Sequence, residues 1–433
     1  MRALQLRKLK KTVAYAYQHI PFYRRALDAA SVHPRDIRSL ADLRRLPITR
    51  RTDLESQGND FISRAPELVA AMRFRTSGTM GKSLELFLTD DEFQYYASMQ
   101  AMGGLMGGFL GPGHIIQSHL PAEASVTGLV SATAARMSGA LTLQLGLHGT
   151  LDEHLKSIFE ERTIPGKFPR VSTIHSAPGY LWALTARAEQ LGLDGRNSGL
   201  RRIFVCGAAV SEGLKARVKK VWGLPLREAY SMVETLSTGA IECDHGRLHF
   251  LDYSGLIEFL DPKTHEPVAP GQPGIAVVTA FYPDRELMPL LRYWSEDLMI
   301  PAATTVCSCG EVGTPINDIL GRADQMVVVG SQNVYPQSLG DALMVFQELA
   351  QPPRFRLRTE EHAEAHHVIL DVESATALGD ADKMQLAEAI KKALILGSEP
   401  HITANLVKST VNILPAGSIQ KPFGYKLQGP TPR

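Results

Sequence analysis

The chain has 433 residues, of which 44% are hydrophobic and 21% are charged, a composition typical of a globular protein with two or three domains. Its 46 Lys and Arg nearly balance 45 Asp and Glu, and the net charge of +1 argues against nucleic acid or an anionic membrane as the main partner. Four cysteines argue against a disulfide framework. No apolar run approaches the ~18 residues of a membrane span. We therefore expect a cytoplasmic protein.

The N-terminal segment is basic and has apolar residues at the helical spacing Leu6, Leu9 and Val13. A targeting peptide and a docking helix with a solvated face both fit this pattern. Because no cleavage-like site follows, we favour the docking helix. Residues 5–60 are predicted to be helical, with breaks at Pro21 and Pro47.

Residues 68–330 alternate between strand-like and helix-like runs, which predicts an α/β body with largely parallel strands. The predicted strands are Gly113–Ser118, Val171–His175, Arg202–Val205, Gly255–Phe259 and Ile275–Thr279, and the predicted helices are Asp91–Met102, Leu151–Glu161, Pro178–Leu191 and Ser211–Val221. Strands between 255 and 300 are closely spaced by Pro and Gly turns, so we expect an antiparallel or barrel-like β appendage there.

After Gly330 the pattern changes to that of a small α+β unit. The predicted elements are strands at Phe355–Thr359, His367–Val372 and Thr403–Lys408 and an amphipathic helix at Asp382–Leu396. We place the boundary near Gly321–Asp324. The expected domains are therefore a large one at 1–322 and a small, mobile one at 323–433.

Residues 75–83 carry the strongest functional signal: Arg-Thr-Ser-Gly-Thr-Met-Gly-Lys-Ser. Glycines allow a ligand close to the backbone, and hydroxyls, amides and a lysine together form a phosphate cradle. A Walker A loop requires glycine where Thr76 stands, and it opens a helix. Here an alternating run, 84–88, follows. We therefore predict a phosphate-binding loop within a strand-turn-strand hairpin.

Four further stretches suggest a nucleotide site. Gly207 and Ala208 form a small-residue turn after a strand, with room for a flat ring. In the run 230–234, Tyr230 can stack on a base and Glu234 can hold Mg²⁺. Asp297 can accept both hydroxyls of a ribose, and Arg322 and Asp324 lie at the predicted domain junction.

Each of these residues alone is more often structural, but their joint order resembles the adenylate-forming ligases, the acyl-CoA synthetase superfamily, and within it the phenylacetate-CoA ligase-like branch. The resemblance spans nearly the whole chain. The motifs that carry it are His19-Ile-Pro-Phe-Tyr23, Asp36-Ile-Arg-Ser-Leu40, Leu46-Pro-Ile48, Thr76-Ser-Gly-Thr-Met-Gly-Lys82, Tyr230-Ser-Met-Val-Glu234, Asp297 and Gly321-Arg322-Ala-Asp324.

The resemblance implies two steps: a carboxylate attacks the α-phosphorus of ATP to give an acyl-adenylate, and a nucleophile, usually the thiol of coenzyme A (CoA), then displaces AMP. Catalytic roles would fall to Lys426, Lys82 and Glu234, the last as the Mg²⁺ ligand. Asp324 would be the hinge of the small domain. Nucleotide binding would involve Thr76, Ser77, Gly78, Thr79, Gly81, Lys82, Gly207, Ala208, Tyr230, Ser231, Asp297 and Arg322.

The chain also departs from the family pattern. Ala208 stands where the family has a glutamate, and Ser231 and Val233 replace the usual Gly and Thr after the tyrosine. In the tail, a lysine that reaches the α-phosphate is expected at the position of Tyr425. Lys426 is one residue away and is our candidate, with Lys421 as the alternative.

Cys243, His249, Cys307 and Cys309 are candidate zinc ligands, because three thiols and one imidazole suit tetrahedral zinc. Buried, inert cysteines are the alternative. The resemblance favours a structural zinc, with His245 as the rival imidazole. Cys206 is interpreted as a packing residue rather than a nucleophile.

Three functions remain open. The first is a ligase that joins a small, aromatic or similarly compact acid to CoA. The second is an adenylating enzyme with another acceptor, such as an amine, a carrier protein or an inorganic nucleophile like nitrite. The third is a member that binds nucleotide without turnover. The branch also suggests a homodimer.

Overall fold

The structure is a computed structural model. It describes the chain except for residues 76–83, 107, 109, 121–125, 147, 161–169, 208–209, 211, 237–238, 304–306, 311–312, 324–326, 330–331, 335, 363–364, 395–406 and 420–433. Two compact units divide the chain: one holds 1–177, 194–207 and 222–319, and the other holds 178–193, 208–221 and 320–433. The predicted boundary between 1–322 and 323–433 stays a prediction.

The first unit begins with helices α1 (Arg2–His19), α2 (Pro21–Ala29) and α3 (Arg51–Gln57). Short 3₁₀ turns connect them at Pro34–Asp36, Leu40–Arg45, Gly58–Phe61 and Pro66–Leu68. Leu9 and Val13 of α1 are fully buried in one core with Phe281 and Leu290. The basic N-terminal segment is thus a docking helix, as predicted. Within the described residues, no helix is both long and apolar enough to cross a membrane.

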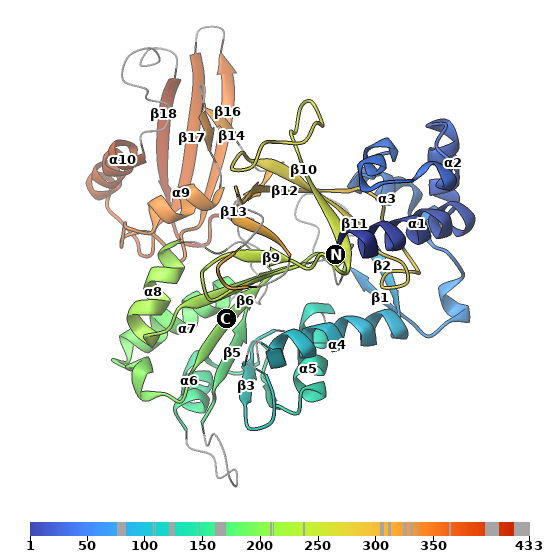
Figure 1. Cartoon of the computed structure of the whole chain (residues 1–433). Coiled ribbons are helices and arrows are strands. Elements are labelled where there is room, and N and C mark those ends of the chain that lie inside the picture. The colour runs from blue at the N-terminus through green and yellow to red at the C-terminus, as the bar shows by residue number, and fades with distance from the viewer. Residues whose placement is uncertain are drawn as a thin grey trace. The chain divides into compact units, whose positions relative to one another are not determined.

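An eleven-stranded sheet runs through this unit, in the order β10-β11-β12-β13-β9-β8-β7-β6-β5-β3-β4 (Figure 1), and residues 320–322 at the end of β13 belong to the second unit. Its strands are β3 (Ile115–Ser118), β4 (Leu141–Gln144), β5 (Thr173–Ser176), β6 (Arg202–Cys206), β7 (Leu226–Tyr230), β8 (Ala240–Glu242), β9 (Leu248–Phe250), β10 (Gly255–Leu260), β11 (Gly274–Ala280), β12 (Tyr293–Pro301) and β13 (Thr314–Arg322). Strands β3 to β7 pair in parallel, and the β10-β11-β12 pairs are antiparallel, so both predicted strand arrangements are confirmed. The antiparallel strands continue the same sheet.

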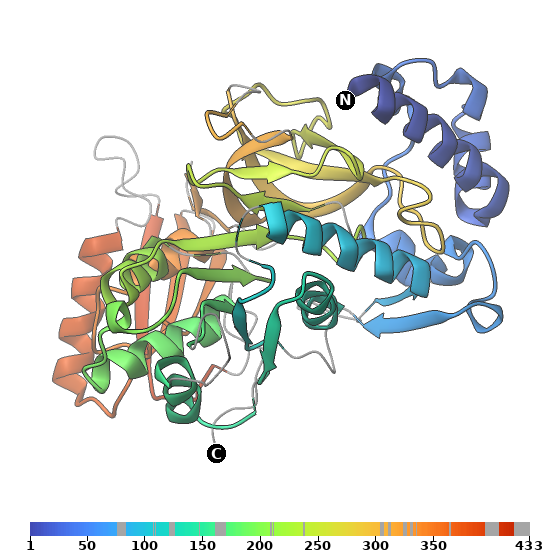
Figure 2. The same ribbon diagram turned by 60° about the horizontal axis from the view of Figure 1, so that its bottom comes forward.

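Helices α4 (Asp90–Met106) and α5 (Val126–Met137) lie side by side in the first unit (Figure 2). Helix α6 (Leu151–Phe159) follows β4. Its first turn is held by a capping box, in which Thr150 and Glu153 exchange backbone-to-side-chain hydrogen bonds. The predicted helices at 91–102 and 151–161 are confirmed, whereas α5 was not predicted.

The predicted hairpin around the phosphate loop is confirmed by its flanking strands. Strand β1 (Ala71–Arg75) pairs antiparallel with β2 (Glu85–Thr89), and Arg75 lies opposite Glu85 at the end of the ladder. The loop between them, with the predicted phosphate ligands, lies outside the described residues.

The second unit contains α7 (Pro178–Gln190), α8 (Glu212–Trp222), α9 (Pro336–Leu343), α10 (Asp380–Leu394), the hairpin β14 (Val327–Val329) and β15 (Gln332–Val334), and the sheet β16 (Phe355–His362), β17 (Ala365–Glu373) and β18 (Val407–Leu414) (Figure 1). Trp222, the last residue of α8, belongs to the first unit. The predicted α+β character of the C-terminal part is confirmed. Strand β18 pairs in parallel with β17 and includes residues 407 and 408 of the strand predicted at 403–408, whose residues 403–406 lie outside the described residues.

One buried ion pair fixes the hairpin within the first unit. Glu92 of α4 and Arg285 form a 2.9 Å salt bridge, and neither side chain is exposed to solvent. The same Glu92 oxygen accepts hydrogen bonds from the backbone amides of Glu286 and Leu287, and its other oxygen accepts one from Thr89 of β2. The ion pair and these hydrogen bonds together offset the free-energy cost of burying the charged carboxylate.

We predict that Glu92→Ala destabilises the protein by about 3–5 kcal/mol, because Arg285 would keep a buried, unpaired charge. Urea denaturation of the purified protein measures this loss. Asp60→Ala is the control, since it removes an exposed pair with Arg25 and should cost less than about 1 kcal/mol. Equal losses in the two variants would contradict the structural role of the buried pair.

Candidate functional site

The candidate site lies at the carboxyl ends of the parallel strands, which is where open α/β sheets bind ligands. Gly207 comes directly after β6 and has φ +87°, a conformation that other residues rarely adopt. A Cβ at this position would meet no atom within 4 Å, so there is open space beside the turn. The predicted partner Ala208 lies outside the described residues.

Tyr230 and Asp297 meet in the structure although 67 residues separate them in the chain. The Tyr230 hydroxyl, at the end of β7, donates a 2.5 Å hydrogen bond to Oδ2 of Asp297 in β12. Burial raises the pKa of Tyr230 well above its usual value, and the Asp297 charge raises it further. The phenol therefore stays protonated and holds the carboxylate in a fixed orientation.

A bulge in β12 presents the Asp297 side chain. Ile275 lies opposite Leu298 and Val277 opposite Trp294, so three residues of β12 face the single residue Ala276 of β11. Glu296 in this bulge has φ +66°. The Ser295 hydroxyl donates to the Ala276 carbonyl at 2.7 Å, which replaces part of the interrupted ladder. Bulges of this kind re-aim side chains next to functional sites.

Glu234 is half-buried in the turn after β7. Its Oε1 accepts a hydrogen bond from the Tyr293 hydroxyl at 3.5 Å, and its backbone carbonyl accepts one from Nε of Arg285 at 3.4 Å. The turn that carries the predicted Mg²⁺ ligand is therefore attached to the buried pair that holds the hairpin. One carboxylate with substrate phosphates is a usual Mg²⁺ environment, so Glu234 fits this role.

A cavity of about 100 Å³ lies between helices α4 and α5 and the ends of β5, β6 and β7. The described residues that line it are Tyr96, Gln100, Leu110, Ile116, Thr127, Ser131, Ala134, Ala135, Thr173, His175, Phe204, Cys206, Ala229, Tyr230, Ser231, Gly239, Ala240, Ile241 and Leu251. No Asp, Glu, Lys or Arg occurs among these lining residues. The cavity therefore suits an uncharged, largely apolar group, with polar contacts at its strand-end side.

Two neutral groups face each other in this cavity. The Cys206 Sγ lies 3.6 Å from the His175 Nε2. Burial raises the pKa of Cys206 to about 12 and lowers the pKa of His175 to about 4. The thiol and the imidazole are thus both uncharged at neutral pH, which favours the packing role for Cys206 over a nucleophilic one.

Several predicted site residues lie outside the described residues and stay predictions: Thr76, Ser77, Gly78, Thr79, Gly81, Lys82, Ala208, Asp324, Lys421 and Lys426. Arg322 is described as the last residue of β13 and is half-buried. Ser231 follows Tyr230 and lines the cavity.

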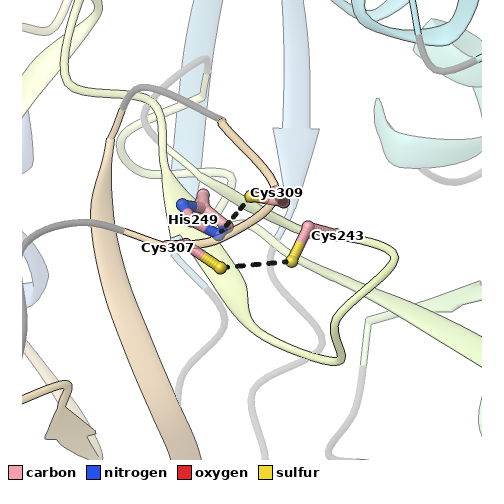
Figure 3. A group of neighbouring side chains, drawn as sticks. All are labelled: Cys243, His249, Cys307 and Cys309. Atoms are coloured by element: carbon pink, nitrogen blue, oxygen red, sulfur yellow. Dashed lines mark hydrogen bonds between the residues drawn. The ribbon is translucent and has the colours of Figure 1, made fainter.

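The four predicted zinc ligands come together in the first unit. Cys243 begins the turn between β8 and β9, His249 lies in β9, and Cys307 and Cys309 share one turn (Figure 3). One ligand atom of each residue lies within 4.8 Å of those of the other three. Figure 3 shows the side chains pointing toward one another. His245, the rival imidazole, is exposed and is not part of this cluster.

The distances in the cluster fit a tetrahedral metal. With Zn–S bonds of about 2.3 Å and Zn–N bonds of about 2.0 Å, tetrahedral edges are roughly 3.8 Å between two sulfurs and 3.5 Å between sulfur and nitrogen. The structure has 3.9 Å between the sulfurs of Cys243 and Cys307, and 3.4 Å between the Cys309 Sγ and the His249 Nε2. A hydrogen bond from the Cys309 amide lowers the pKa of Cys307 to about 6, which favours a thiolate ligand.

Sequence reasoning missed helix α5 and its contribution to the cavity. Thr127, Ser131 and Ala135 recur every four residues and line the cavity from one helix face. A repeat of small residues at this spacing was the available signal, but no element was predicted for residues 126–137. The Glu92–Arg285 pair had no signal, because its partners are far apart in the chain.

No protein-family model matches the chain. A phenylacetate-coenzyme A ligase of Thermus thermophilus is 29% identical over 370 residues, which cover 83% of this chain and 79% of that protein. The phenylacetate-coenzyme A ligase of Escherichia coli is 26% identical over 406 residues, with 90% and 87% covered.

Among solved structures, 2-hydroxyisobutyryl-CoA ligase in the postadenylation state with 2-HIB-AMP is similar, with a TM-score of 0.78 and 21% identity over 99% of this chain and 88% of that one. The same ligase in the thioesterification state, with 2-HIB-AMP and CoA, gives a TM-score of 0.65 and 22% identity over 96% of this chain and 87% of that one. These structures share the fold of this chain.

We predict that stability falls as the pH drops from about 6.5 toward 4, because two histidines of lowered pKa, the buried His119 and the partly buried His175, are neutral in the folded state. Burial lowers the pKa of His119 to about 3 and of His175 to about 4. The unfolded chain binds these protons near pH 6.5, so acid favours unfolding over this interval. His119→Gln should reduce the slope of unfolding free energy against pH by up to about 1.4 kcal/mol per unit.

Urea denaturation across that pH range measures the slope, and His19→Gln, at an exposed histidine, is the control. The slope should be unchanged in the control variant. An unchanged slope in His119→Gln would mean that this imidazole is already protonated in the folded protein.

Proposed function

We propose that this chain, which belongs to the adenylate-forming superfamily and resembles its phenylacetate-CoA ligases, activates a compact carboxylic acid with ATP and transfers the acyl group to CoA. The observation that carries the proposal is the contact between Tyr230 and Asp297 beside the cavity. This contact joins two motif residues at the sheet edge where a nucleotide is expected.

In the first step, an oxygen of the acid attacks the α-phosphorus of ATP, and the bond to the β-phosphate bridging oxygen breaks to release pyrophosphate. The acid would enter the cavity with its carboxylate toward Ser231, Asp297 would hold the ribose hydroxyls, and Tyr230 would contact the adenine. Lys82 and its loop would hold the β- and γ-phosphates. Phosphoryl transfer depends mainly on such positioning and on charge neutralisation.

The first step also needs positive charge near the α-phosphate, and two cations would supply it. Mg²⁺ held by Glu234 would offset the developing negative charge. Lys426 of the C-terminal tail would add a second cation, with Lys421 as the alternative. Both lysines follow from the resemblance and await direct test.

In the second step, the CoA sulfur attacks the acyl carbon and AMP leaves with the bonding electrons. The names of the relatives support CoA as the acceptor. The chain has Ala208 where the family has a glutamate near the adenine. Because the chain departs from the family pattern at this nucleotide-binding position, an acceptor other than CoA is the second candidate.

The cavity supports a compact acid. Its volume is about 100 Å³. For comparison, an apolar cavity of about 150 Å³ holds a benzene molecule. A short branched chain therefore approaches the limit of this space, and a ring would need the cavity to widen, so the aromatic preference rests on the relatives' names alone.

We predict pyrophosphate exchange into ATP when the protein is incubated with a suitable compact acid, and a thioester when CoA is added. Asp297→Asn should lower the exchange about 10–100-fold, because it removes charged hydrogen bonds to the ribose. Asp60→Asn, at an exposed site, is the control. Exchange is measured with labelled pyrophosphate and a panel of aryl and short aliphatic acids.

The outcomes separate the candidate functions. An absence of exchange with every acid favours nucleotide binding without turnover. Exchange without thioester formation favours another acceptor. Exchange that is unaffected by Asp297→Asn would contradict the proposed ribose contact.

We also propose that Cys243, His249, Cys307 and Cys309 hold a structural zinc. All four ligands come from protein, so no position is left for a substrate, and the metal would stabilise the two turns that supply it.

Purified protein is predicted to contain about one equivalent of zinc by elemental analysis, since a closed Cys₃His site binds this metal tightly. Cys307→Ser should lose most of it and unfold at a lower temperature. Cys206→Ser is the matched control, because this buried cysteine is outside the cluster. Less than about half an equivalent in wild type, or full retention in Cys307→Ser, would remove the assignment.

A further inference from the structure

Ser131 is the lining side chain that stands out in the acid cavity. Its Oγ is buried and has no hydrogen-bond partner among the described residues. The residue is only 9% exposed and lies on the cavity face of α5. A buried hydroxyl without a partner loses about 1–3 kcal/mol relative to a satisfied one, so such a group calls for a ligand.

Among the other described lining residues, no buried side-chain nitrogen or oxygen lacks a partner. Tyr96 makes side-chain hydrogen bonds with Ser231 and Gln100. His175 faces Cys206. Thr173 also has an interaction partner. Ser131 is therefore the lining residue whose buried polar atom is left for the occupant of the cavity, within the part of the chain that the structure describes.

Along helix α5, Ser131 lies between two other residues that line the cavity. Thr127 is one helical turn before it, and Ala135 is one turn after it and packs against Ile116 below. Four residues advance about 6 Å along the helix. Tyr230 ends β7 and Ser231 follows it, and the proposed function places the reacting carboxylate at this strand end. The Ser131 hydroxyl would thus meet a part of the acid several ångströms from its carboxylate.

We propose that Ser131 recognises a hydroxyl group on the acid, at a position remote from the carboxylate. This inference rests on the proposed function and narrows its substrate class to compact, hydroxylated monocarboxylic acids. A second carboxylate is disfavoured, because no cationic side chain lines the described cavity and an unpaired buried charge is costly. A hydroxyl is small enough for the space and satisfies the buried oxygen.

The test compares matched acids in wild type and Ser131→Ala. Butyrate is paired with its hydroxybutyrates, phenylacetate with meta- and para-hydroxyphenylacetate, and succinate serves as the dicarboxylic probe. Initial rates of ATP–pyrophosphate exchange give kcat/KM for each acid. Wild type should favour the best hydroxylated acid over its parent by about tenfold, the effect of one net hydrogen bond.

Ser131→Ala should abolish this preference, so that the ratio of kcat/KM for the hydroxylated acid and its parent falls to about one or below, and Ser131→Thr, which retains the hydroxyl, should preserve it. Ser138→Ala is the matched control: Ser138 is buried just after α5, donates to the Ala135 carbonyl at 2.6 Å and does not line the cavity. The ratio of two acids in one preparation does not depend on the fraction of folded enzyme.

The inference is overturned if wild type has a higher kcat/KM for the parent acids than for the hydroxylated ones, or if Ser131→Ala keeps the preference. It is also overturned if kcat/KM for succinate equals that for the monocarboxylic acids. Those results would not contradict the proposed adenylation activity. An absence of exchange with every acid would instead overturn the proposed function and this inference together.

Discussion

The buried ion pair between Glu92 and Arg285 is the constraint on which the geometry of the candidate site depends. Glu92 receives hydrogen bonds from the end of β2, the strand that follows the predicted phosphate loop, and from the segment after Arg285. The same guanidinium reaches the carbonyls of Phe87 and Glu234. One fully buried carboxylate thus fixes the hairpin, the start of α4 and the turn of the predicted Mg²⁺ ligand relative to one another. A hydrophobic pair could pack as well but would not specify this register.

The sheet supplies the second part of the arrangement. Parallel strands β5, β6 and β7 end at a common edge, where small residues such as Gly207 leave space for a ligand. The antiparallel strands extend the same sheet, and the bulge in β12 turns Asp297 toward Tyr230. The residues predicted to bind the nucleotide therefore lie at the same sheet edge as the cavity proposed for the acid, because Tyr230 contacts Asp297 and also lines the cavity.

Much of this fold follows from local patterns in the sequence. The alternation of apolar runs predicts strands β3, β5 and β6 and helices α4, α6, α7 and α8, and the failure of the Walker pattern at Thr76 correctly predicts a hairpin. The four zinc candidates were predicted from residue types, and the structure brings all four together. The sequence favours His249 and leaves His245 as the rival, and the structure groups His249 with the three cysteines, from strand β9 paired with β13.

Features that depend on distant contacts could not be predicted. The bulge that re-aims Asp297 arises from a register shift between β11 and β12, and a register is not visible in one strand alone. Ser131 reads as an ordinary helical serine until the helix is packed against the sheet. The residues 76–83 and 420–433 bear the predicted Lys82 and Lys426 and lie outside the described residues, so the roles of both lysines stay predictions.

A crystal structure of the protein with a non-hydrolysable acyl-adenylate analogue tests the central claim most directly, because one molecule then reports both halves of the site. The account predicts that the ribose hydroxyls lie within hydrogen-bond distance of Asp297 and that the acyl tail enters the cavity beside α5. An adenosine bound away from Asp297, or an acyl tail outside this cavity, would contradict it.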